Sequence, residues 1–322
     1  MGKQMASKSS RSFIFIFSHI ICIVCLTGCN GFKPIPTPTS TYTPTKTLIP
    51  TSTYTVTPEP SRTATLIPLP TSSMNDKSSI SLAKECRNVM DGLYKLKKDL
   101  GLPDHLTGEN PTREDTDFDP NQYFQILSHL SLTPGYVLDY IYFGDELGGK
   151  PLLYARKTNA KPFLTYDDLL KSYGEELSGE RSYSQLNHAF DYLEKIQIDK
   201  SLESYYQFIV LASLGDQFYL FWHGLYNDVK IMCDSSDLKL IYEDMKDFEI
   251  ELPIDIANEM ERIDFNPVVA EDKVTVSVRF VTFTKWGGFF ENVYILDKEK
   301  MPLELVDVQW HPIIEYDCGI AF

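Results

Sequence analysis

The sequence predicts an α+β fold, with N-terminal helices, antiparallel sheet and a C-terminal β-meander. Three observations support this fold class. Apolar residues recur at helical spacing over residues 80–100, and apolar and polar residues alternate over residues 274–280. Helix-like and strand-like segments are also grouped along the chain rather than alternating regularly, which favours antiparallel strand pairing.

Two helices are expected at the start of the folded part. The first covers residues 80–100, and Gly101 ends it. The second begins at Asp119, an N-cap residue followed by a first-turn proline, and ends near Leu132. Three later helices are expected as well, one from Thr165 to Leu170, one with a capping box at Ser182 and Gln185, and one over residues 236–245.

The strands are predicted by runs of aromatic and branched residues. Residues 136–143 and 152–156 form a predicted hairpin around a glycine-rich loop. Residues 205–213, 217–225 and 229–233 are expected to be strands, and the second of them reads as a central strand because both of its faces are apolar or aromatic. Residues 274–280, 289–296 and 303–310 complete the predicted meander.

The first 28 residues have the three parts of a secretory signal: a basic start, an apolar run and a small-residue boundary. The apolar run ends in Leu26-Thr27-Gly28-Cys29, which resembles the lipobox of bacterial lipoproteins. The resemblance implies that Cys29 receives a diacylglyceryl group, becomes the new N-terminus after cleavage, and anchors the chain to the outer face of the membrane. Two acyl chains are enough for stable anchoring.

Residues 29–75 form the second predicted region, a disordered tether rich in Thr, Pro and Ser. Spaced prolines prevent helix or sheet from propagating, and the segment has too little apolar surface to fold. As an extended spacer it reaches at most on the order of 140 Å. The third region, residues 76–322, is the globular part, with a possible division into two lobes near residues 160 or 200.

The globular part is strongly acidic. Residues 76–322 hold 44 acidic and 24 basic residues, a formal charge of −20. Such a domain repels phosphate backbones and anionic lipid, so nucleic acid is disfavoured as a partner and the membrane contact is expected through Cys29. Cationic ligands, metal ions and neutral sugars all remain open.

Three cysteines follow Cys29 in the chain, and they are Cys86, Cys233 and Cys318. An exported protein is free to form disulfides, and an odd number leaves at least one thiol over. Cys233 and Cys318 both lie at the ends of predicted strands, so we expect their pairing, with three unpaired thiols as the alternative.

Two motif-like stretches do not carry the chemistry that they suggest. Residues 144–150 fit G-x-x-x-x-G-K, but Pro151 and a strand follow where a phosphate-binding loop needs Ser or Thr and a helix. Residues 115–121 alternate acids like the start of a calcium loop but lack its later glycine and glutamate. We therefore expect no metal site and no cofactor.

The residues chosen as ligand contacts are Trp222, His223 and Trp286. His223 follows Trp222 on the predicted central strand, and the turn at Trp286-Gly287-Gly288 is expected to direct that indole outward, where it would suit stacking on a sugar. The alternative for all three is ordinary core packing. No catalytic residue is assigned, because no nucleophile elbow or metal-binding histidine pair is present in the sequence.

The expected function is non-catalytic binding of a ligand or partner, either glycan or protein, in the cell envelope. The alternative is an extracellular hydrolase acting on wall glycan or peptide, with His223 as its main candidate group. Three stretches, residues 148–151, 218–223 and 316–319, are similar to uncharacterised domains of other Thr/Pro-tethered bacterial lipoproteins. That resemblance implies no activity.

Overall fold

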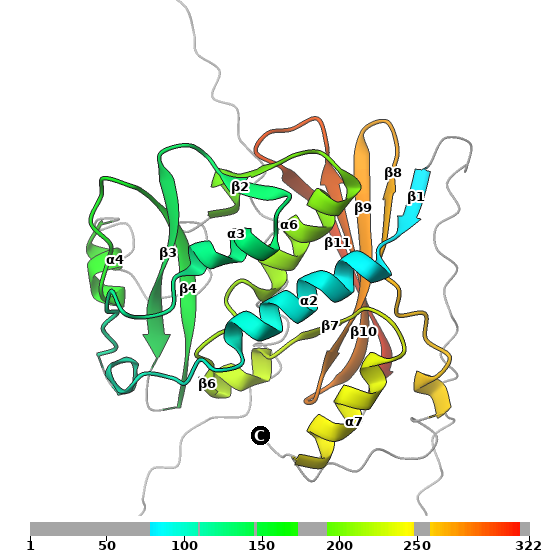
Figure 1. The fold of residues 1–322 in the computed structure, drawn as a ribbon, viewed down its shortest axis with the longest axis horizontal. Helices are drawn as coiled ribbons and strands as arrows, with labels where there is room; N and C mark the ends of the chain where they lie inside the picture. Colours follow the sequence, from blue (N-terminus) through cyan, green and yellow to red (C-terminus); the bar gives the residue numbers. More distant parts are fainter. Residues whose placement is uncertain (1–77, 109, 145–146, 173–191, 248–257, 316–322) are drawn as a thin grey trace, which may run out of the picture.

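The computed structural model describes residues 78–108, 110–144, 147–172, 192–247 and 258–315. Within them the fold is α+β and all strand pairs are antiparallel, as predicted. A six-stranded sheet lies on one side of the molecule and a three-stranded sheet on the other (Figure 1). The predicted signal and tether lie outside the described residues.

The six-stranded sheet contains the predicted meander. Its order is β1-β8-β9-β10-β11, and β7 pairs with one end of β9. The strands are β1 (Ser78–Ser81), β7 (Lys230–Met232), β8 (Val268–Glu271), β9 (Thr275–Thr284), β10 (Gly288–Asp297) and β11 (Glu304–Glu315). The strands expected near residues 229–233 and in the C-terminal meander are confirmed, and β1 and β8 were not predicted.

The predicted hairpin is also confirmed, with longer strands. Strands β3 (Tyr136–Gly144) and β4 (Gly148–Lys157) pair along their whole length. The two-residue strand β6 (Phe221–Trp222) adds to the end of β4. A separate two-stranded sheet joins β2 (Leu130–Leu132) to β5 (Ile196–Ile198).

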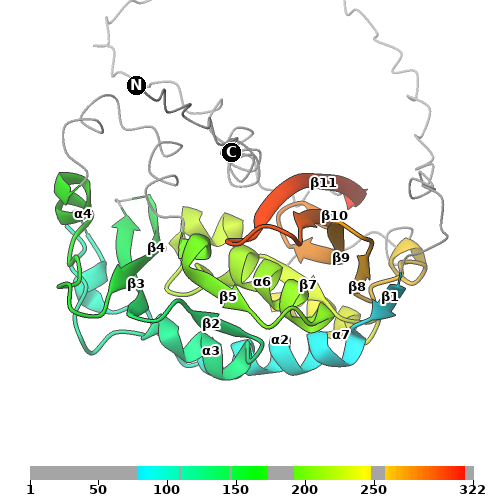
Figure 2. The ribbon, with the colours of Figure 1, turned by 90° about the horizontal axis from the view of Figure 1, so that it is seen from above.

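Helices α2 (Ala83–Lys97) and α6 (Leu202–Leu214) build the core that joins the sheets. The predicted stripe of α2 is buried at Cys86, Val89 and Leu93. The largest core cluster combines these residues with side chains of α6 and of both sheets. Figure 2 shows α6 between the six-stranded sheet and the layer formed by α2 and α3 (Tyr123–Ile126).

The prediction of a strand at residues 205–213 was wrong, since α6 occupies this segment. Its residues are apolar on every face, so the sequence shows no helical period. A helix that is buried all round has this pattern. The missed signal was Ser201, whose hydroxyl caps the helix by accepting a hydrogen bond from the Ser204 backbone N–H at 3.1 Å.

The prediction of a central strand at residues 217–225 was also wrong. Tyr219 and Trp222 both have positive φ angles, 52° and 44°, which an extended strand does not contain. Only β6 forms a ladder here, and the 3₁₀ helix η5 (His223–Asn227) follows it directly.

The other helix predictions are mostly confirmed. Thr165 caps α4 (Tyr166–Ser172) by accepting from the Asp168 N–H at 3.1 Å, and α7 (Asp237–Asp247) occupies the expected place. The helix expected from Asp119 starts as predicted, because the Asp119 side chain caps η2 (Pro120–Gln122), but helical structure ends at α3 and β2 follows. The capping box at Ser182 and Gln185 lies outside the described residues.

Two further short helical segments are the 3₁₀ helices η1 (Asp104–Leu106) and η4 (Tyr192–Lys195).

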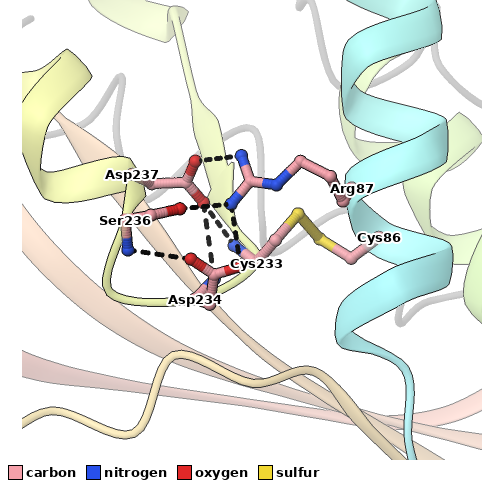
Figure 3. The surroundings of a disulfide bond; sticks show 6 residues. All are labelled: Cys86, Arg87, Cys233, Asp234, Ser236 and Asp237. Carbon is pink, nitrogen blue, oxygen red and sulfur yellow. Dashed lines mark hydrogen bonds and ion pairs between the residues drawn. A yellow bond between two sulfur atoms is a disulfide. The ribbon is translucent and has the colours of Figure 1, made fainter.

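The expected Cys233–Cys318 pairing was wrong. Cys233 forms a disulfide with Cys86, and the two Cα atoms are 5.5 Å apart (Figure 3). Helix α2 brings Cys86 against the end of β7, where Cys233 follows, and this packing between distant segments is invisible in the sequence. Cys318 lies outside the described residues.

An ion-pair cluster stands beside the disulfide. Arg87 pairs with Asp237 and, at 3.0 Å, with Asp234, and it also donates to the Ser236 hydroxyl at 3.1 Å (Figure 3). The hydrogen bond from Arg87 to Asp237 raises the pKa of the guanidinium above its usual value. The carboxylate of Asp237 also accepts from the Cys233 N–H at 2.7 Å. Helix α2 is therefore fixed to the β7–α7 connection by covalent and ionic links.

Candidate binding surface

The surface feature that stands out is the turn at residues 221–224. Strand β6 pairs Phe221 with Gly149 and Trp222 with Gly148, at the end of the hairpin. The His223 N–H then donates to the Leu147 carbonyl at 3.1 Å. The backbone of the turn is therefore fixed to the hairpin through these contacts.

Glycines permit this close approach. A Cβ on Gly148 would lie 2.9 Å from both the His223 nitrogen and the Phe221 oxygen. A Cβ on Gly224 would lie 2.4 Å from the Gly149 carbonyl oxygen, which is backbone and cannot rotate away. The turn and the hairpin can meet in this way because neither position carries a side chain.

Trp222 has an unusual backbone conformation. Its φ of 44° and ψ of −111° lie close to the first central position of a type II′ turn. That position normally holds glycine, because a Cβ makes positive φ unfavourable. A non-glycine residue in such a region costs on the order of 1–3 kcal/mol, and such residues cluster at functional sites.

The strained residue places an indole ring in solvent. Trp222 is 59% exposed, Phe221 40% and Leu147 61%, and His223 is exposed beside them. The rings of Trp222 and His223 meet edge to face, with centroids 5.7 Å apart and planes at 84°. We call these four residues the aromatic patch. Soluble proteins seldom gather large exposed apolar side chains in this way without a binding role.

Trp286, the third predicted contact, meets the same turn in a different way. The expectation that its indole points outward was wrong, because Trp286 is half-buried and its indole N–H donates to the Leu225 carbonyl in η5 at 2.9 Å. The Lys285 ammonium lies 5.1 Å from the centroid of its ring. The structure thus brings the three predicted residues to one turn, with Trp222 and His223 at the surface and Trp286 holding η5.

Polar groups near the turn are paired. The Lys150 ammonium lies 3.4 Å from the Asp216 carboxylate, which also accepts from Gln217 at 3.0 Å. Burial lowers the pKa of Lys97 to about 8, although Asp228 and Asp216 act in the opposite direction. Asp216 thus interacts with two ammonium groups: it pairs with that of Lys150, and its charge acts on that of Lys97, which is partly desolvated.

The sequence did not indicate a second polar cluster, which holds residues 104–118 against the hairpin. Asp139, 2% exposed, lies between Arg113 at 3.0 Å and Arg156 at 2.6 Å. The His105 Nε2 atom lies 2.8 Å from the nearly buried Asp117 carboxylate. The signal that could have indicated this cluster was a single acid within the apolar strand around Asp139.

A third cluster contains serine, histidine and aspartate but lacks the geometry of a catalytic triad. Both Asp199 Oδ2 and Ser201 Oγ approach the same nitrogen of His129, Nδ1, at 2.6 and 3.2 Å. A triad places its acid and its nucleophile on different ring nitrogens. Burial acts to raise the pKa of Asp199, but hydrogen bonds from Ser201 and His129 hold it well below its usual value. Ser201 serves here as the cap of α6.

The acids that alternate like a calcium loop are used for local structure instead. Asp117 pairs with His105, Asp119 caps η2, and the Asn121 side chain bonds to the backbone of Leu138 on β3. Among the residues that the structure describes, no group of three or more His, Cys, Asp or Glu is arranged to hold a metal ion. The glycine-rich stretch before Lys150 lies at the turn of the β3–β4 hairpin.

Comparisons with protein-family models, with curated proteins and with solved structures find no match for this chain. In the described part of the chain, no helix has the length and apolar character needed to span a membrane.

Proposed function

We propose that this chain is a lipid-anchored protein of the bacterial cell surface that binds a partner non-catalytically through the aromatic patch. The binding proposal is based mainly on Trp222, whose indole is exposed and whose backbone has a positive φ that favours glycine. An unstrained turn would have glycine at this position, so the presence of tryptophan supports a role at the surface.

The proposed location is supported by the lipobox-like residues ending at Cys29 and by the tether that follows. The buried disulfide between Cys86 and Cys233 adds independent support, because disulfides persist mainly in oxidising compartments outside the cytosol.

The hydrolase alternative gains no comparable support. In the described chain, the His105 and His129 pairs with aspartate both serve local structure, the first by closing a loop and the second beside a helix cap. His223 contributes its ring to the aromatic patch, where it meets the ring of Trp222 edge to face.

The binding proposal is tested by titrating the purified full-length protein, carrying Cys29→Ser to remove the acyl anchor as a route to the membrane, onto isolated cell envelopes and measuring the bound fraction. We expect saturable binding that weakens roughly tenfold in Trp222→Ala, since a desolvated hot-spot aromatic typically contributes 1 kcal/mol or more. Leu240→Ala is the matched control, because Leu240 is 57% exposed on α7, outside the aromatic patch. Equal binding by the Cys29→Ser protein with and without Trp222→Ala would overturn the proposal.

The anchor is tested separately by metabolic labelling with a palmitate analogue. We expect label on the native chain, none on Cys29→Ser, and accumulation of the unprocessed precursor when lipoprotein signal cleavage is inhibited. Label that persists in Cys29→Ser would exclude Cys29 as the lipidation site.

A further inference from the structure

We infer that the aromatic patch receives a cationic side chain, lysine or arginine, presented by a segment of another polypeptide. This inference rests on the proposed function and specifies the chemistry of the partner. It depends on the charge of the globular part, the geometry of the two rings, and the apolar residues beside them.

Charge selects the class of partner. The globular part has a formal charge of −20, and a net charge of this size produces a negative potential over the surface. Polyanionic partners are therefore repelled, whereas a basic segment is drawn to the protein and its association is accelerated. The nearby Lys150 ammonium does not reverse this field locally, because Asp216 pairs with it.

Ring geometry supplies the contact. An aromatic face carries partial negative charge and attracts a cation within about 6 Å of the ring centroid, and tryptophan is the strongest of the aromatic residues in this respect. Trp222 and His223 meet edge to face, with ring planes at 84° and centroids 5.7 Å apart, and Trp222 is 59% exposed. The exposed indole of Trp222 therefore offers the ammonium or guanidinium group an aromatic face beside the imidazole.

The neighbouring apolar residues favour a polypeptide over a free amine. Leu147 and Phe221 are 61% and 40% exposed in the segments next to Trp222. Lysine and arginine side chains lay their methylene stems along apolar surface while the charged group stays at its edge. The aromatic patch thus offers a surface for the stem as well as for the charge.

The test measures the affinity of the full-length protein for three probes by calorimetry. The first is a synthetic peptide that repeats Lys-Leu-Ser-Gly, the second is the same peptide with every lysine acetylated, and the third is a neutral glucan oligosaccharide. We expect the lysine peptide to bind about tenfold more tightly than the acetylated one, and its affinity to fall as salt rises. Trp222→Ala should lose this preference, Trp222→Phe should retain part of it, and Leu240→Ala should match the native protein.

The failures of the two proposals are distinguishable. Equal binding of the acetylated peptide, tighter binding of the glucan, or no binding of the lysine peptide would each overturn the cationic assignment. The binding proposal would still stand if envelope binding remained dependent on Trp222. Phe221→Ala provides a second variant should Trp222→Ala fold poorly, and unchanged lysine-peptide affinity in both folded variants would overturn the inference.

Discussion

At the scale of single residues, the structure separates groups that stabilise from groups that are available to bind. Asp139 and Trp222 mark the two extremes, because the first is 2% exposed and ion-paired with two arginines while the second is 59% exposed. The sequence indicated Trp222 and His223 as contacts because an aromatic-histidine pair is conspicuous. It gave no comparable weight to Asp139, whose partners Arg113 and Arg156 come from a different loop and strand.

Asp139→Asn should lower the free energy of unfolding by about 3 kcal/mol, because it leaves two largely buried guanidinium groups without their carboxylate. Denaturant unfolding followed by fluorescence measures the change. Asp91→Asn, an exposed residue on α2, is the control and should change stability little. A loss in Asp139→Asn no larger than in the control would show that the cluster does not hold residues 104–118 in place.

At the scale of elements, segments whose apolar residues recur at a regular spacing were predicted correctly. Two segments without such a spacing were assigned the wrong structure. Helix α2 and the first half of strand β9 show one apolar face and were found, and strand β10, which is buried on both faces, was found from the glycine turn before it. Helix α6 and the segment before η5 have apolar side chains on all sides. A continuous apolar run of this kind is compatible with a helix, a strand or a turn, so the sequence pattern could not distinguish them. The glycines at positions 148 and 224 read as loop residues, and their role in packing two segments together depends on tertiary structure.

Gly224→Ala should destabilise the protein by roughly 1–3 kcal/mol, because its Cβ would lie 2.4 Å from the Gly149 carbonyl oxygen. The displaced turn should also weaken envelope binding. Gly101→Ala is the matched control, since no atom lies within 4 Å of a Cβ built there. Thermal unfolding of the two variants provides the measurement, and equal stability would mean that the turn moves away from the hairpin without cost.

At the scale of the whole molecule, the disulfide is a covalent link between two distant parts of the chain. It joins cysteines 147 residues apart and fixes α2 to the end of β7. The sequence could not identify the pair, because three cysteines allow several pairings and the packing of α2 against β7 selects one. The acidic charge of the globular part, by contrast, depends only on composition and could be counted from the sequence.

Removing the disulfide with Cys86→Ser and Cys233→Ser together should lower the free energy of unfolding by about 2–5 kcal/mol, because the unfolded chain regains the freedom of a long loop. The reduced native protein should lose a similar amount, while the double variant should not respond to reductant. An effect of reductant on the double variant equal to that on the native protein would show that this disulfide is not the stabilising link.

The most direct test of the account compares the stability and envelope binding of Trp222→Gly and Trp222→Ala. Both remove the indole, but only glycine relieves the positive φ of 44°. Glycine usually destabilises a protein relative to alanine by about 0.5–1 kcal/mol. We predict the reverse here, with Trp222→Gly more stable than Trp222→Ala by about 1 kcal/mol and both variants defective in binding. A less stable glycine variant, or native binding in either variant, would contradict the claim that the strained backbone at Trp222 is retained for binding.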